Sequence, residues 1–119
     1  MASTERADEL LRCVDPWGRE IVLTAATWTL HVLPDRAPLV GNEEGVRLTL
    51  TAPQVVMRDA TRDDRAVYYR RGALPAPYDH LYLKVVVDFP TAGTASTDGR
   101  VATAFPTRRF RPGEQQTWP

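Results

Sequence analysis

Apolar and polar residues alternate most clearly in the second half of the chain. In residues 81–89, Leu, Val and Phe occupy every second position, and Lys84 falls between them. This period of two predicts a β-strand. Residues 66–70 and 101–105 are rich in strand formers on either side of it, and residues 55–57 predict a further short strand. Three consecutive strands joined by loops predict an antiparallel meander whose middle strand is buried on both faces.

The first half of the chain predicts a hairpin followed by two short helices. Residues 10–14 and 19–23 are strand-like runs around the turn sequence Asp-Pro-Trp-Gly, which favours two antiparallel strands. Thr24 is suited to cap a helix that ends at Pro34. Residues 43–51 have apolar side chains four apart, which predicts a second helix weakened by its glycine and threonines.

These elements together predict an α+β fold, with an N-terminal β-hairpin and two short helices packed on one face of an antiparallel β-sheet meander. A chain of 119 residues is long enough for one such domain and too short for two. We expect residues 1–9 to be a flexible lead-in and residues 10–119 to form the domain. We also expect Pro106 to stop the last strand.

The composition excludes several classes of protein. The formal net charge is zero, but residues 1–57 hold 5 basic and 8 acidic side chains, whereas residues 58–119 hold 10 basic and 7 acidic. A single cysteine excludes an internal disulfide. Residues 21–33 are too short and too polar to span a bilayer, and residues 1–6 lack the order of a signal peptide. We therefore expect a cytoplasmic protein with no membrane partner.

Lys84 is the only lysine among 15 cationic residues. Arginine suits bidentate contacts with phosphate, although a GC-rich genome produces the same bias. A lysine between valines on an inner strand needs either solvent or a partner. If the strands pair in the simplest register, Tyr69 and Thr103 lie beside Lys84 and form an anion site. The alternative is the polar outer face of a one-sided sheet.

Two other features carry candidate chemistry. His31 is a candidate proton carrier, because histidine is the usual proton carrier in reactions at neutral pH, or it packs beside Trp28 without a catalytic role. The last strand carries Thr103 and Thr107 and leads into a basic segment, which is either an RNA-binding rim or a solvated tail. The histidines and the cysteine are not at metal-ligand spacing, and neither a glycine-rich phosphate loop nor a nucleophile elbow is present. We expect no metal and no cofactor.

Several segments occur in an order that is similar to a known family. They are residues 28–32 (WTLHV), 67–70 (VYYR), 83–87 (LKVVV), 101–107 (VATAFPT), and the trailing Gly113, Glu114 and Trp118. Together they resemble the small phage and bacterial domains grouped with barnase, EndoU, colicin E5/D and RelE, known as BECR-fold nucleases. The most specific segment is residues 103–107 (TAFPT).

This resemblance implies a metal-independent ribonuclease, often a toxin or effector module, with helices packed on a four-stranded antiparallel sheet. RNA is the expected substrate, and an antitoxin or immunity protein is a possible partner. The candidate catalytic residues are His31, Lys84, Tyr69, Thr103 and Thr107, and the candidate substrate-binding residues are Arg36, Arg70, Arg108 and Arg109.

The implied chemistry is attack of an RNA 2′-hydroxyl on its own phosphodiester. His31 is the base or acid, Lys84 with Arg36 or Arg70 stabilises charge, and Tyr69 with a threonine positions the phosphate. Similar sequences often have a second His-Pro where this chain has Arg36-Ala37. This departure puts a two-histidine acid/base pair in doubt.

Two other functions are compatible with the same residues. One is a non-catalytic or degenerate nuclease-like module that binds RNA or a protein, which the zero net charge and the absent second histidine favour. The other is an enzyme that acts on a small nucleotide such as NAD through the same anion-binding face. Fold resemblance does not choose among these three functions.

Overall fold

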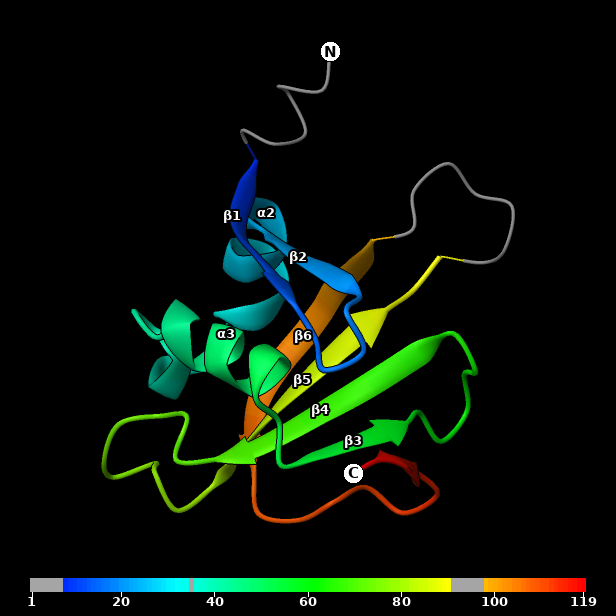
Figure 1. Ribbon diagram of the computed structural model, residues 1–119. Helices are drawn as coiled ribbons and strands as arrows, with labels where there is room; N and C mark the ends of the chain where they lie inside the picture. The colour runs from blue at the N-terminus through cyan, green and yellow to red at the C-terminus, as the bar shows by residue number, and fades with distance from the viewer. Residues whose placement is uncertain (1–7, 35, 91–97) are drawn as a thin grey trace.

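Seven strands form one mixed sheet in the order β1-β2-β6-β5-β4-β3-β7 (Figure 1). The structure is a computed structural model that describes residues 8–34, 36–90 and 98–119. The strands are β1 (Glu9–Val14), β2 (Glu20–Thr24), β3 (Val55–Arg58), β4 (Arg65–Arg71), β5 (Tyr82–Asp88), β6 (Gly99–Thr107) and β7 (Gln115–Trp118). The helical segments are α2 (Ala25–Thr27), the π-helical turn η1 (Trp28–Val32), the 3-10 turn η2 (Ala37–Leu39) and α3 (Glu43–Thr51). The chain thus has the expected α+β character.

The N-terminal hairpin is part of the sheet and does not pack on it as a separate element. β1 and β2 pair antiparallel as expected, and β2 then pairs in parallel with the start of β6 through Ile21 and Val22. A Cβ at Gly99 would lie 2.6 Å from the Phe89 ring, so glycine permits the close start of β6. The expected purely antiparallel sheet, and the four strands that the resemblance implied, are therefore wrong. Alternation within a strand specifies its faces but not its neighbours.

The first helical segment forms where the sequence predicts it. The backbone N–H of Thr27 donates to the hydroxyl of Thr24 at 3.1 Å, which is the expected N-cap. Trp28 and Val32 are buried against the sheet, whereas His31 is exposed. The apolar stripe of this segment is therefore narrow, and the histidine lies outside it.

Helix α3 matches the expected range of residues 43–51. Its Gly45 is required by packing, because a Cβ there would lie 2.5 Å from the carbonyl oxygen of Ala73. Val46 and Leu50 are fully buried against the sheet. The glycine that weakens the isolated helix thus lets it approach the loop after β4 closely.

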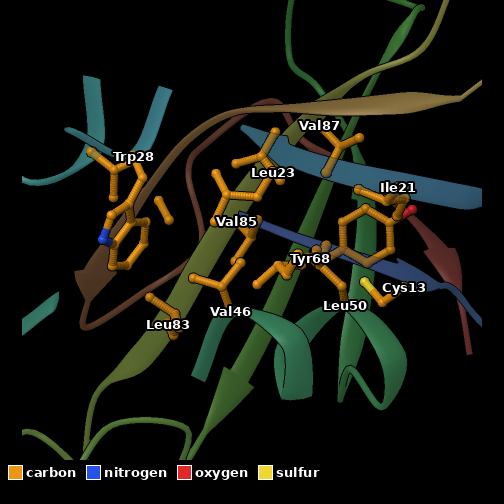
Figure 2. Close-up of a cluster of buried hydrophobic side chains, with 14 of the residues drawn as sticks. Cys13, Ile21, Leu23, Trp28, Val46, Leu50, Tyr68, Leu83, Val85 and Val87 are labelled. Atoms are coloured by element: carbon orange, nitrogen blue, oxygen red, sulfur yellow. The ribbon is translucent and has the colours of Figure 1, made fainter. Parts of the chain in front are cut away.

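The strands β4, β5 and β6 form the expected antiparallel meander. Leu83, Val85 and Val87 of β5 point into the main core together with Trp28 and residues of α3 (Figure 2). We call this side of the sheet the helix face. The opposite side, which we call the second face, carries a smaller cluster formed by Met57, Val67, Tyr69 and Val86. Residues 83–87 are buried throughout, so the middle strand is covered on both faces as predicted.

Two strand boundaries and one additional strand differ from the expectation. Pro106 lies inside β6, because β2 pairs with β6 only as far as Arg100 and leaves the rest of that edge without a strand partner among the described residues. Glu9 already belongs to β1, and residues 1–7 of the expected lead-in lie outside the described residues. Strand β7 was not predicted, since its Gln-Gln-Thr-Trp sequence lacks an apolar alternation.

Candidate functional site

Most of the predicted site residues gather on the second face of the sheet. Tyr69 on β4 lies directly opposite Lys84 on β5, as expected from the simplest register. Across the next strand pair Lys84 faces Phe105, while Thr103 faces Val86. Thr103 is therefore two residue pairs further along the strands than Lys84, on the same face.

Lys84 is a buried cation with a buried counter-charge. Only 8% of its side chain is exposed, and its Nζ lies 3.0 Å from Oε2 of Glu114. The same ammonium lies 5.5 Å from the centre of the Tyr69 ring and 5.4 Å from that of Phe105. The lysine between valines thus has a partner, as its desolvation requires.

Glu114 holds both Lys84 and Tyr69 and was not among the predicted site residues. Its side chain is fully buried, and Oε1 accepts the phenolic O–H of Tyr69 and, at 3.3 Å, the backbone N–H of Arg111. Burial and this hydrogen bond raise the pKa of Tyr69, so the phenol stays a donor. A buried lysine without a neighbouring acid is the signal that points to a distant carboxylate.

The segment between β6 and β7 brings Glu114 to this position. It runs from the end of β6 back to β3, where β7 pairs (Figure 1). On the way Phe110 packs against Tyr69 and Tyr82, with ring centres 4.7 and 5.1 Å away. The segment therefore lies on the second face and covers the tyrosine end of it.

Arg36 connects the first helical segment to β6. Its Nη1 donates to the hydroxyl of Thr103 at 2.7 Å and to the carbonyl of His31 at 2.9 Å. The guanidinium also lies 5.2 Å from the centre of the Phe105 ring. These contacts bring residue 31, a guanidinium and a hydroxyl to the edge of the sheet along β6, where no described residue adds a further strand.

The predicted residues differ in which polar groups remain available. Thr103 accepts from Arg36, and its own O–H has no acceptor among the described residues. The imidazole of His31 is exposed and likewise has no hydrogen-bond partner in that part of the chain. By contrast, Tyr69 donates its proton to Glu114, and Thr107 donates its proton to the carbonyl of Arg109 at 3.2 Å. The hydroxyl protons of Tyr69 and Thr107 are thus bound within the protein, whereas that of Thr103 has no acceptor among the described residues.

The predicted arginines other than Arg36 do not gather around Lys84. Arg70 pairs across the sheet with Leu83 on the helix face and donates to the carbonyl of Ala52 at 2.6 Å. It therefore does not lie with Lys84, because the two residues have opposite positions in the alternation. Arg108 and Arg109 are exposed in the segment that follows β6.

A second buried carboxylate lies on the helix face. The Oδ2 atom of Asp15 accepts from Tyr68 at 2.7 Å and from Arg19 Nε at 2.8 Å, and Oδ1 accepts the backbone N–H groups of Trp17 and Arg19. Burial and the bond to Asp15 raise the pKa of Tyr68. This group fixes the hairpin turn onto β4.

Comparisons with family models, with curated proteins and with solved structures find no match for this chain. Within residues 8–34, 36–90 and 98–119, no group of three or more His, Cys, Asp or Glu side chains is placed to hold a metal ion. None of the helices in those ranges is long and apolar enough to cross a bilayer. The candidate site therefore has to be judged from its own geometry.

Proposed function

We propose that this chain is a metal-independent ribonuclease that cleaves RNA through its own 2′-hydroxyl. The observation that carries the proposal is the bridge made by Arg36, which binds both the Thr103 hydroxyl and the His31 backbone. It is supported by Lys84 on the neighbouring strand of the same face. These four residues supply a histidine side chain, two cations and a hydroxyl whose proton has no acceptor among the described residues, which is the set that the reaction needs.

Each available group has a role in the proposed reaction. His31 takes the proton of the 2′-hydroxyl, and the 2′-oxygen forms a bond to the adjacent phosphorus. Arg36 and Lys84 stabilise the negative charge on the phosphorane oxygens, and Thr103 donates its free O–H to one of them. Glu114 positions the ammonium of Lys84 and does not touch the substrate.

The reaction closes with the departure of the 5′-oxygen. The P–O5′ bond breaks, its electron pair goes to the 5′-oxygen, and a water molecule protonates that oxygen. The hydroxide left by the water takes the proton from His31, which returns the histidine to its neutral form. The products are a 2′,3′-cyclic phosphate and a 5′-hydroxyl. Solvent acts as the acid in this proposal because the proposed site holds one histidine, His31.

A non-catalytic module that binds RNA or a protein is the second candidate. One observation favours it: the charge of Lys84 is already matched by Glu114, and little of the lysine side chain is exposed. An ammonium in this state contributes less to a developing negative charge than a free one does. In this case the second face would bind a phosphate without cleaving it.

Purified protein incubated with a defined RNA in EDTA separates the two candidates. A ribonuclease leaves 2′,3′-cyclic phosphate ends, and His31→Ala lowers the rate by about 100-fold or more, the usual contribution of a general base. Arg62→Gln is the matched control, because Arg62 is an exposed arginine paired with Asp64 away from the site. Intact RNA with the wild-type protein would contradict the proposal, and retention of RNA without cleavage would support the binding module.

The proposal extends to a toxin or effector role in the cytoplasm. Expression of the wild-type chain should then slow cell growth, and His31→Ala or Lys84→Ala should relieve the effect at equal protein levels. An antitoxin or immunity protein would act by covering the second face. Equal growth with all three chains argues against a toxin.

A further inference from the structure

A pocket lies at the same edge of the sheet as the Arg36 bridge. It is lined by Arg36, Pro38, Phe105 and Pro106 and has a volume of about 390 Å³. This volume is within the range of roughly 300 to 1,000 Å³ that is usual for small-molecule sites. Three of the four lining residues are apolar, and the fourth supplies a cation.

Arg36 offers this pocket a defined set of donors. All the hydrogen bonds that the Arg36 side chain makes to described residues come from its Nη1 atom. Their acceptors are the Thr103 hydroxyl and the carbonyls of His31 and Val32. The Nε–Nη2 edge of the guanidinium has no partner in that part of the chain. This edge carries two parallel N–H groups, which is the geometry that binds two adjacent acceptors.

We infer that the pocket binds a nucleobase, and that it selects guanine or cytosine. The inference rests on the proposed function, since the base belongs to the nucleotide whose phosphate lies beside Thr103. An aromatic ring flanked by prolines provides a stacking surface for any base. Guanine presents O6 and N7 as adjacent acceptors, and cytosine presents O2 and N3, so both match the two donors of Arg36. Adenine and uracil place a donor next to each acceptor on the corresponding edges.

The geometry also gives Arg36 a second use, besides the phosphate contact that the resemblance implies for it. A guanidinium with one nitrogen bound to the protein has a fixed plane and retains one two-donor edge. It therefore serves base selection and phosphate binding at once. Lysine at this position keeps the charge but loses the pair of parallel donors.

The test measures binding of the four nucleoside 3′-monophosphates by NMR titration of ¹⁵N-labelled protein. The phosphate is common to all four, so differences report the base. We expect guanosine and cytidine 3′-monophosphates to bind at least ~5-fold more tightly than the other two, in the range expected for a bidentate contact. The largest shifts should fall on the backbone amides of Phe105 and Thr107 and on the side chain of Arg36, beside the pocket.

Two variants separate stacking from selection. Arg36→Lys should bring the four affinities together, and Phe105→Leu should weaken all four while it keeps the preference. Arg62→Gln should behave as wild type. Thermal unfolding of each variant identifies any that lose the fold, and the wild-type preference itself remains decisive in that case.

The outcomes distinguish this inference from the proposed function. Equal affinities for the four nucleotides, or shifts confined to residues away from the pocket, overturn the base pocket even if RNA is cleaved. A preference for guanine and cytosine that is lost in Arg36→Lys supports the pocket even if RNA stays intact, in which case only the ribonuclease proposal fails.

Discussion

Tyr68 and Tyr69 are adjacent on β4, point to opposite faces of the sheet, and are each held by a buried carboxylate that also pairs with a cation. On the helix face, the Asp15 carboxylate accepts four hydrogen bonds, two of them from the backbone of its own turn, and the side chain of its partner Arg19 is 40% exposed. On the second face, the only partner of Glu114 Oε2 among the described residues is the ammonium of Lys84, which is itself buried.

The difference shows which group is built for stability alone. The Asp15 carboxylate is fully satisfied, and its partner Arg19 is open to water, so this group fixes the hairpin turn onto β4 and needs no other explanation. The Glu114 group differs in its cation, because the Lys84 side chain is only 8% exposed and has little solvation of its own. Lys84 lowers the stability of the fold in this way, and such a position is a candidate for a functional role.

The largest expected effect comes from removing the carboxylates. Glu114→Gln leaves the Lys84 ammonium buried without a counter-charge and should lower the free energy of unfolding by about 3–5 kcal/mol. Asp15→Asn should cost less, about 1–3 kcal/mol, because Arg19 can turn toward solvent. Urea unfolding at neutral pH measures both values.

The double variant Lys84→Met/Glu114→Gln is the control for this comparison. It should recover most of the stability lost in Glu114→Gln, since no unpaired charge remains. A smaller loss for Glu114→Gln than for Asp15→Asn would contradict the proposed contrast between the two groups.

The two threonines of β6 provide the next test. Thr103→Val removes both the acceptor of Arg36 and a free donor, and it should lower the cleavage rate by about 100-fold, as for loss of one transition-state donor. Thr107→Val has the same shape change on the same face, but the Thr107 proton is already bound to Arg109, so the rate should change little. Initial rates on one RNA, compared at equal folded protein, decide between the two threonines. Equal losses would show that the free proton of Thr103 is not important.

Removing the tyrosine hydroxyls should also lower the free energy of unfolding more on the second face than on the helix face, by a smaller margin than removing the carboxylates. Tyr69→Phe leaves Oε1 of Glu114 with only the long bond from Arg111, and we expect a loss of about 1–3 kcal/mol. Tyr68→Phe leaves Asp15 with three hydrogen bonds and should cost about 1 kcal/mol. Thermal or urea unfolding of the pair gives the order, and a reversed order would place the more fragile group on the helix face.

The smallest effect concerns Cys13 on the helix face. Burial raises the pKa of its thiol to about 11, so the thiol stays protonated below that pH. The native protein should therefore react with a thiol reagent at pH 8 far more slowly than the protein in urea. Fast native labelling would show that the helix face opens readily.

The sequence predicted the strands and their faces because alternation is local. Lys84 and Tyr69 were expected to be neighbours from the simplest register of three successive strands, and they are. The parallel pairing of β2 with β6 and the addition of β7 depend on contacts between distant segments, and no local pattern reports them.

The candidate site was predictable to the same extent. Lys84, Tyr69 and Thr103 share one face because their positions in the alternation agree, whereas Arg70 was assigned to the wrong face although that same alternation excludes it. The role of Glu114 was not predicted because this residue lies in an irregular segment. The bridge made by Arg36 was not predicted because it reaches β6 from outside the sheet. The acceptors of the Tyr69 and Thr107 hydroxyl protons became known only from the hydrogen bonds of the structure.

The most direct test of the account is to ask which face of the sheet binds RNA. An oligonucleotide with 2′-O-methyl groups throughout lacks the attacking hydroxyl and binds without being cleaved. Titrated into ¹⁵N-labelled protein, it should shift the amide signals of residues 103–105 and Thr107 of β6 and of Lys84 and Arg36, while those of α3 and β1 stay in place. Shifts confined to α3 and β1, or no shifts at any concentration that keeps the protein folded, would contradict an RNA-binding second face.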